Sequence, residues 1–225
     1  MDGFLALFSQ YNIPGAFLVN IELTLWSALF STILGVILVM MRISPIASLR
    51  TVSGAYVELF KNLPLTIIMV FMVLGAYAQL KFSFSDTFAT NFFWLAVTGL
   101  SLYTAAFVCE SLRSGINTVP LGQAEAARAL GLNFMQAATQ IILPQAFKNV
   151  LPAMCNEFVT IIKESAITYT IGVQDIMAMV QAIKSASYII MEPLLVATAL
   201  YFCLCFPTSK LIAYFERRMS HGDKR

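Results

Sequence analysis

Four stretches of the chain run for 17 to 23 residues without Asp, Glu, Lys or Arg, and they lie at 23–41, 62–80, 87–109 and 193–209. A helix needs about 20 mainly apolar residues to cross the hydrocarbon core of a bilayer. All four stretches are therefore predicted to be membrane-spanning helices. A fifth uncharged stretch, 129–147, is rich in Gly, Pro, Asn and Gln. Lack of charge alone does not make a segment soluble in lipid, so this stretch is not expected to cross.

The basic residues are distributed unevenly between the connecting segments. Eleven of the 14 follow the first, third or last uncharged stretch: Arg42, Arg50, Lys61, Arg113, Arg128, Lys148, Lys210, Arg217, Arg218, Lys224 and Arg225. Cytoplasmic loops of membrane proteins carry such an excess of Lys and Arg. The first loop, the segment after the third span and the C-terminal tail are therefore predicted to be cytoplasmic, with the N-terminus outside.

This orientation requires an odd number of crossings between the cytoplasmic segment after Arg113 and the cytoplasmic end of the last span. The best candidate is 150–170, which is apolar except for Glu157, Lys163 and Glu164. The predicted fold is a single all-α domain over 1–225, with a cytoplasmic loop at 114–148 and a helix within 172–192 at the outer surface. Its five transmembrane helices are expected at about 17–41, 56–80, 90–112, 149–170 and 193–215.

The composition agrees with a membrane protein and excludes several other classes. Hydrophobic residues make up 59% of the chain and charged residues 12%, against roughly 25% charged residues in soluble domains. A soluble enzyme and a nucleic-acid-binding protein are therefore not expected, and membrane lipid is the expected surrounding. The four cysteines and the single histidine show no ligand spacing, so neither a metal site nor a catalytic residue is predicted.

The cytoplasmic loop contains a helix with recognisable ends. The run 123–130 favours a helix, and Gly131 is placed to end it in the left-handed conformation. Asn133 can then cap a second helix, with Gln136 as its capping-box partner. Glu125 is expected in the first turn, where the helix dipole favours a carboxylate.

Small side chains on this loop helix would let another protein or helix approach its backbone closely. Ala124, Ala126 and Ala127 lie along it, and small residues allow such approach at packed helix interfaces. Two interpretations stay open from the residues alone. The helix packs on its own transmembrane bundle, or it is a docking element for a cytoplasmic partner.

Glu125-Ala126-Ala127, Gly131 and Ile142-Leu143-Pro144 resemble the EAA loop of ABC importer permeases. The segments 122–132 and 141–147 are similar to the permeases of polar amino-acid importers of the histidine/glutamine/glutamate type. Three more segments match that family in order, YVELFKNLPL at 56–65, ESLRSGI at 110–116 and NEFVTIIKESAI at 156–167. The last of these departs from the family pattern at Ala166, where a second hydroxyl is usual.

The resemblance implies a type I importer permease in a bacterial cytoplasmic membrane, with several partners. These are two ABC ATPase subunits that carry ATP and Mg, a second permease subunit (identical or homologous) and an extracytoplasmic amino-acid-binding protein. The sequence has no G-x-x-x-x-G-K-[ST] phosphate-binding pattern, so hydrolysis is expected on the ATPase subunits and no cofactor on this chain. The residues expected to couple to the ATPase are Gln123, Glu125, Ala126, Ala127, Gly131 and Pro144.

Charged and polar residues in the fourth predicted span are candidates for the substrate pathway, because charge at membrane depth is costly. They are Glu157, Lys163, Glu164 and Ser165. In the alternative interpretation Lys163 and Glu164 reach the outer interface or pair with each other, and Glu157 makes a polar contact within the bundle. The resemblance implies that the cargo is a polar amino acid of the glutamate or glutamine kind. The alternatives are that the chain is the permease of an ABC importer for another small solute, or that it is a secondary transporter.

Overall fold

The computed structural model describes residues 11–188 and 190–220, with the side chains of 215–220 left out, and all its regular elements are helical. The helix α2 begins where the Asn12 side chain accepts a hydrogen bond from the backbone of Gly15 and Pro14 occupies the first turn. The helices are α2 (Ile13–Ile43), α3 (Ala47–Asn62), α4 (Leu65–Phe71), η1 (Met72–Gln79), α5 (Phe88–Ile116), α6 (Leu121–Ala129), α7 (Phe134–Ala137), η2 (Ala138–Ile142), α8 (Leu143–Glu164), η3 (Ser165–Ile171), α9 (Ile176–Ser187) and α10 (Met191–Ser220).

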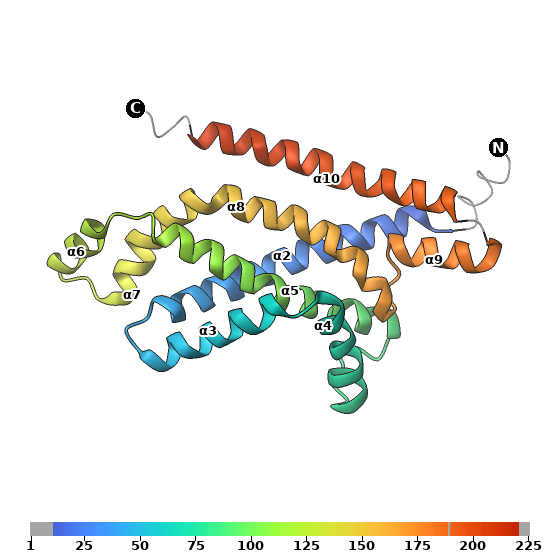
Figure 1. Ribbon diagram of the computed structural model, residues 1–225, viewed down its shortest axis with the longest axis horizontal. Helices are drawn as coiled ribbons and strands as arrows, with labels where there is room; N and C mark the ends of the chain where they lie inside the picture. Colours follow the sequence, from blue (N-terminus) through green and yellow to red (C-terminus); the bar gives the residue numbers. More distant parts are fainter. Residues whose placement is uncertain (1–10, 189, 221–225) are drawn as a thin grey trace.

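The centre of the bundle is formed by α2, α5 and α8, which run along one another (Figure 1). Two glycines allow this close packing. A Cβ added to Gly35 on α2 would lie 2.5 Å from Val108 on α5, and one added to Gly115 would lie 2.2 Å from Val150 on α8. The core between these helices includes Leu38, Val39, Val108, Cys109, Leu112 and Met154.

The span predicted at 56–80 is not one straight helix. It is divided between α3 and the pair α4–η1, and the two parts are bent by 106°. The break lies at Leu63, whose φ of −97° and ψ of 135° are extended, and Pro64 follows it. The physical reason is that proline lacks the N–H of a helical hydrogen bond and drives the preceding residue out of the helical region.

The boundary predicted between a loop at 114–148 and a span at 149–170 falls within continuous helical structure, and the point where the chain enters the membrane stays a prediction. Helical structure runs from Phe134 to Ile171 through α7, η2, α8 and η3. Pro144 stands in the first turn of α8, directly after the π-helical turns of η2, and Pro152 lies inside α8. Neither proline ends the helix, so less of the predicted loop is irregular than expected.

The helix expected within 172–192 is present as α9. Gly172 has a φ of 96°, and Asp175 caps α9 by accepting a hydrogen bond of 2.7 Å from the backbone of Ala178. The apolar face of α9, which includes Ile176, Val180 and Ile183, packs in a cluster with the start of α2 and with α10.

Three helices in the described residues are long and apolar enough to cross a membrane: α2, α5 and α10. The number rises to five when each of the two bent helix pairs is counted as one span. The five-span count and the orientation of the termini stay predictions. Few side chains of α10 are buried, and it lies along the outside of the bundle (Figure 1).

Candidate functional site

The helix α6 lies with α7 at one end of the molecule, beyond the ends of α5 and α8 (Figure 1). It ends as predicted at Gly131, whose φ is 80°. The backbone N–H of Gly131 donates to the carbonyl of Arg128 at 2.9 Å, and that of Leu132 donates to the carbonyl of Ala127 at 3.1 Å. This pair of bonds forms a Schellman motif, which satisfies the last carbonyls of a helix.

The capping box predicted for the next helix is also confirmed. The Asn133 side chain accepts from the backbone N–H of Gln136 at 2.9 Å, and the Gln136 side chain accepts from the backbone N–H of Asn133 at 3.0 Å. The turn from α6 to α7 is therefore held by hydrogen bonds on both sides of a single left-handed glycine. It forms a defined corner rather than a flexible connection.

The position predicted for Glu125 within its helix is wrong. The helix begins at Leu121, with Pro120 extended before it, and it has no acidic residue in its first turn. Glu125 is therefore in the second turn, where the dipole effect has largely faded. The prediction started the helix two residues too late because it treated Pro120 to Gly122 as a break.

The surface that α6 and α7 present differs from the expected set of docking residues. Gln123, Glu125, Ala126, Gly131 and Pro144 are exposed, but Ala127 is completely buried and packs within the unit. Four large apolar side chains that sequence reasoning missed are exposed beside them: Leu121 at 83%, Leu130 at 79%, Met135 at 57% and Phe134 at 37%. The sequence pattern that could have predicted them is a large apolar residue among the small and polar residues of this loop.

The pathway candidates on α8 occupy different surroundings. Glu157 and Glu164 are half-buried, and Lys163 is exposed. Among the described residues the one ion pair joins Arg113 to Glu110, so Lys163 and Glu164 do not pair with each other. The Tyr103 hydroxyl on α5, which sequence reasoning also missed, lies within electrostatic range of both glutamates.

Ser165 is fully buried and belongs to a polar network inside the bundle. Its hydroxyl accepts a hydrogen bond of 2.9 Å from the Asn20 side chain and donates one of 2.7 Å to the carbonyl of Ile162. The Asn20 amide also donates to the Tyr201 hydroxyl at 3.1 Å and accepts from the backbone N–H of Ile176 at 3.0 Å. One side chain thus ties α2 to η3, α9 and α10.

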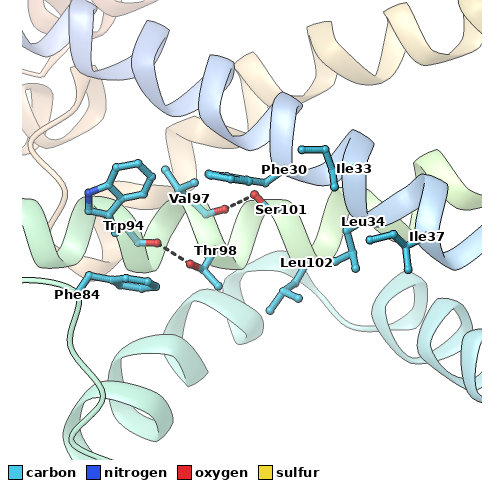
Figure 2. A pocket seen from close by; sticks show the side chains of 10 residues that line it. All are labelled: Phe30, Ile33, Leu34, Ile37, Phe84, Trp94, Val97, Thr98, Ser101 and Leu102. Atoms are coloured by element: carbon cyan, nitrogen blue, oxygen red, sulfur yellow. Dashed lines mark hydrogen bonds between the residues drawn. The ribbon is translucent and has the colours of Figure 1, made fainter.

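A large apolar cavity of about 610 Å³ opens between α2 and α5 (Figure 2). Its polar side chains are Thr98 and Ser101, and each hydroxyl donates to a carbonyl of its own helix, that of Trp94 at 2.8 Å and that of Val97 at 2.6 Å. Figure 2 shows the rest of the lining to be apolar, including Phe30 and Ile37, apart from the indole N–H of Trp94. The lining has no charged group, so an apolar molecule such as a hydrocarbon chain fits it better than a polar solute does.

Comparison with known proteins places the chain in a family. Residues 31–221 match the model of the binding-protein-dependent transport system inner membrane component. The chain belongs to this family, as its resemblance to importer permeases predicted. It is the permease component of an ABC transport system and an integral membrane protein.

Individual relatives agree with this assignment. The chain is 48% identical over 163 residues to the glutamate transport system permease protein GluC of Corynebacterium efficiens, a match that covers 70% of this chain and 72% of GluC. It is 34% identical to the arginine transport system permease protein ArtQ of Bacillus subtilis, over 91% of both chains. The crystal structure of an amino acid ABC transporter with histidines superposes with a TM-score of 0.82 at 31% identity, over 96% of this chain and 98% of that chain.

Proposed function

We propose that this chain carries a polar amino acid, glutamate or a glutamine-like compound, across a bacterial cytoplasmic membrane. The observation that carries the proposal is the rigid α6–Gly131–α7 corner, with its exposed small and apolar side chains, at one end of a helical bundle. Two relatives named glutamate transport system permease protein GluC, 48% and 45% identical, favour glutamate as the cargo.

The partners in this proposal supply what the chain lacks. Two ATPase subunits bind ATP and Mg and hydrolyse the nucleotide. A second permease subunit completes the pathway, and an extracytoplasmic binding protein delivers the amino acid. The exposed residues Leu121, Glu125 and Leu130 contact the ATPase, and Ala127 holds the shape of the helix that presents them.

The arrangement of the helices provides a route for mechanical coupling. α6 is joined to α5 by four residues, and α7 continues through η2 into α8 without a break. A displacement of α6 and α7 by the ATPase would therefore move α8, which bears Glu157, Lys163 and Glu164. These residues, with Tyr103, are proposed to line the pathway. Ser165 is proposed to position them through Asn20, because its hydroxyl is already engaged.

The break at Leu63 and Pro64 supports a pathway on the same side of the bundle. Irregular backbone at membrane depth is tolerated where it is buried in protein or lines a water-filled cavity. α4, which starts at this break, packs against η3 directly after Glu164. The helix that starts at the break thus packs beside the charged end of α8.

The test is uptake of radiolabelled glutamate into proteoliposomes that contain the permease with its ATPase, with the binding protein outside and ATP inside. Glutamate, glutamine, arginine and histidine serve as unlabelled competitors. ATP-dependent uptake that glutamate or glutamine suppresses best is expected. Uptake that follows a membrane potential without ATP would support a secondary transporter instead, and competition only by a non-amino-acid solute would overturn the proposed cargo.

A further inference from the structure

A second, polar cavity of about 300 Å³ lies between α2, α3 and α5, near the end of the bundle that carries α6. Its volume is at the lower limit of the roughly 300–1,000 Å³ of small-molecule sites. Charged side chains of both signs line it. They are Arg42 from α2, Glu58 and Lys61 from α3 and Glu110 from α5, together with Val57 and Asn62.

These charges are close to one another but mostly unpaired. Glu110 is within electrostatic range of Arg42 and Lys61. Its one ion pair in the described part of the chain is with Arg113, which donates both of its hydrogen bonds to the same oxygen, Oε1. Arg42, Glu58 and Lys61 take part in no ion pair among the described residues. Two cations and two carboxylates thus line one cavity without neutralising each other directly.

The Arg42 side chain carries a buried donor without an acceptor. Its Nη1 is buried and has no hydrogen-bond partner in the described residues. The guanidinium lies against α3 at Gly54, where an added Cβ would stand 3.2 Å from Nη1. A buried donor left unsatisfied is destabilising. An anion bound in the cavity would therefore meet a guanidinium that still has an unused donor.

We propose that this cavity binds a free amino acid as its zwitterion, at the end of the bundle where the ATPase docks. Arg42 and Lys61 would bind the α-carboxylate, and Glu58 and Glu110 would bind the α-ammonium group. The inference rests on the proposed function, because the amino acid that reaches this site is the one the transporter releases. A filled site would slow further release, so accumulated amino acid would inhibit its own uptake.

The mixture of charges distinguishes an amino acid from a simple anion. A lipid phosphate or inorganic phosphate would be attracted by the two cations but repelled by Glu58 and Glu110. A zwitterion satisfies both pairs at once. The α-amide of the same amino acid, which lacks the carboxylate, and its N-acetyl derivative, which lacks the ammonium group, therefore test the two halves of the site separately.

The experiment measures the initial rate of uptake into proteoliposomes loaded with ATP and with increasing unlabelled glutamate. Only complexes with the ATPase facing the lumen are active, so the lumenal glutamate reaches the α6 end. Half-inhibition by millimolar lumenal glutamate is expected, with much weaker inhibition by its α-amide, its N-acetyl derivative or phosphate. Equal inhibition by phosphate or by the N-acetyl derivative would overturn the amino-acid site in favour of an anion site.

Variants assign the inhibition to this cavity. Arg42→Gln, Lys61→Gln and Glu58→Gln should each raise the half-inhibitory concentration by roughly tenfold, the effect expected for losing one charge-assisted hydrogen bond. Lys61 and Glu58 are exposed, so these two variants keep the test valid if Arg42→Gln does not fold. Gly54→Ala should give a smaller increase without changing a charge, because its Cβ, 3.2 Å from Nη1, would shift the guanidinium by a few tenths of an ångström.

Lys210→Gln is the matched control. Lys210 is an exposed cation on α10 that stands over the Phe206 ring and does not line the cavity, so its variant should be inhibited like the unmodified protein. Unchanged half-inhibition in all the cavity variants would overturn the site while leaving the transport function intact. Absence of uptake in the unmodified complex would contradict the proposed function itself.

Discussion

Asn20 uses both of its amide hydrogens and its carbonyl oxygen inside the bundle, on Ser165, Tyr201 and the backbone of Ile176. The Asn20→Ala substitution leaves these groups without their partner in a buried place. We expect the free energy of unfolding in detergent to fall by roughly 2–4 kcal/mol, because a buried polar group without a partner costs about 1–3 kcal/mol. Thermal unfolding of the purified chain measures this.

Thr24→Val is the control for Asn20→Ala. Thr24 lies one turn along the same helix, and its hydroxyl donates to the carbonyl of Asn20 at 2.8 Å, so its loss removes one local bond only. If Thr24→Val lowers the unfolding temperature as much as Asn20→Ala does, the Asn20 network contributes no more to stability than one local hydrogen bond.

Gly131 is the residue on which the shape of the α6–α7 corner depends. A Cβ there would meet no atom within 4 Å, yet its φ is 80°, so Gly131→Val acts through backbone strain of about 1–2 kcal/mol. We expect loss of uptake and of ATPase co-purification, with normal amounts of permease in the membrane. Gly122→Val is the control, since Gly122 also has open space around it but no positive φ. Normal uptake by Gly131→Val would contradict the docking role.

The third prediction about single residues concerns Lys163 and Glu164. Lys163→Ala and Glu164→Ala should each lower the rate of amino-acid uptake, by roughly tenfold or about 1.4 kcal/mol, because they remove charge from the proposed pathway. ATPase co-purification should stay normal. Lys184→Ala on α9 is the control, an exposed cation away from α8. Full uptake rates in both α8 variants would assign these side chains to the membrane interface.

At the scale of elements, the structure changes what Glu125→Lys should do. Glu125 is exposed in the second turn of α6, so the charge reversal has little dipole interaction to lose. The unfolding free energy should change by less than about 0.5 kcal/mol, while ATPase co-purification falls because the docking surface has the wrong sign. Glu125→Gln should give a smaller loss. A clear drop in unfolding temperature without a loss of ATPase would reverse this interpretation.

The elements that could be predicted from sequence are those decided by local chemistry. The ends of α6 and α7 depend on Gly131, Asn133 and Gln136, which act on backbone groups within a few residues, and these predictions are confirmed. The course of the chain past prolines was harder. Pro64 breaks a helix while Pro152 does not, because the neighbouring helices decide whether the lost hydrogen bond is tolerated. The partners of Asn20, 145 to 181 residues away, have no local signal at all.

On the scale of the whole molecule, the sequence identified a membrane permease because charge depletion and four ordered motifs extend over most of the chain. It could not identify where the charged residues meet. The cavity between Arg42, Glu58 and Glu110 joins residues from three helices, and only their packing brings the charges together. α10, which buries few of its side chains in this chain, leaves an apolar surface for lipid or for another protein chain.

The last prediction concerns the division of labour between subunits. The sequence contains no pattern for cradling nucleotide phosphates, and the cavities described above are apolar or lined by carboxylates as well as cations. Purified alone, this chain should therefore neither bind nor hydrolyse ATP, and hydrolysis should begin when the ATPase subunit is added. The measurement is phosphate release by the chain alone, by the ATPase mixed with the chain, and by the ATPase mixed with the Gly131→Val chain. Hydrolysis by the chain alone, after removal of contaminating ATPase, would contradict its assignment as the transport subunit, whereas a Gly131→Val chain that neither binds the ATPase nor supports uptake would support the α6–α7 corner as the connection.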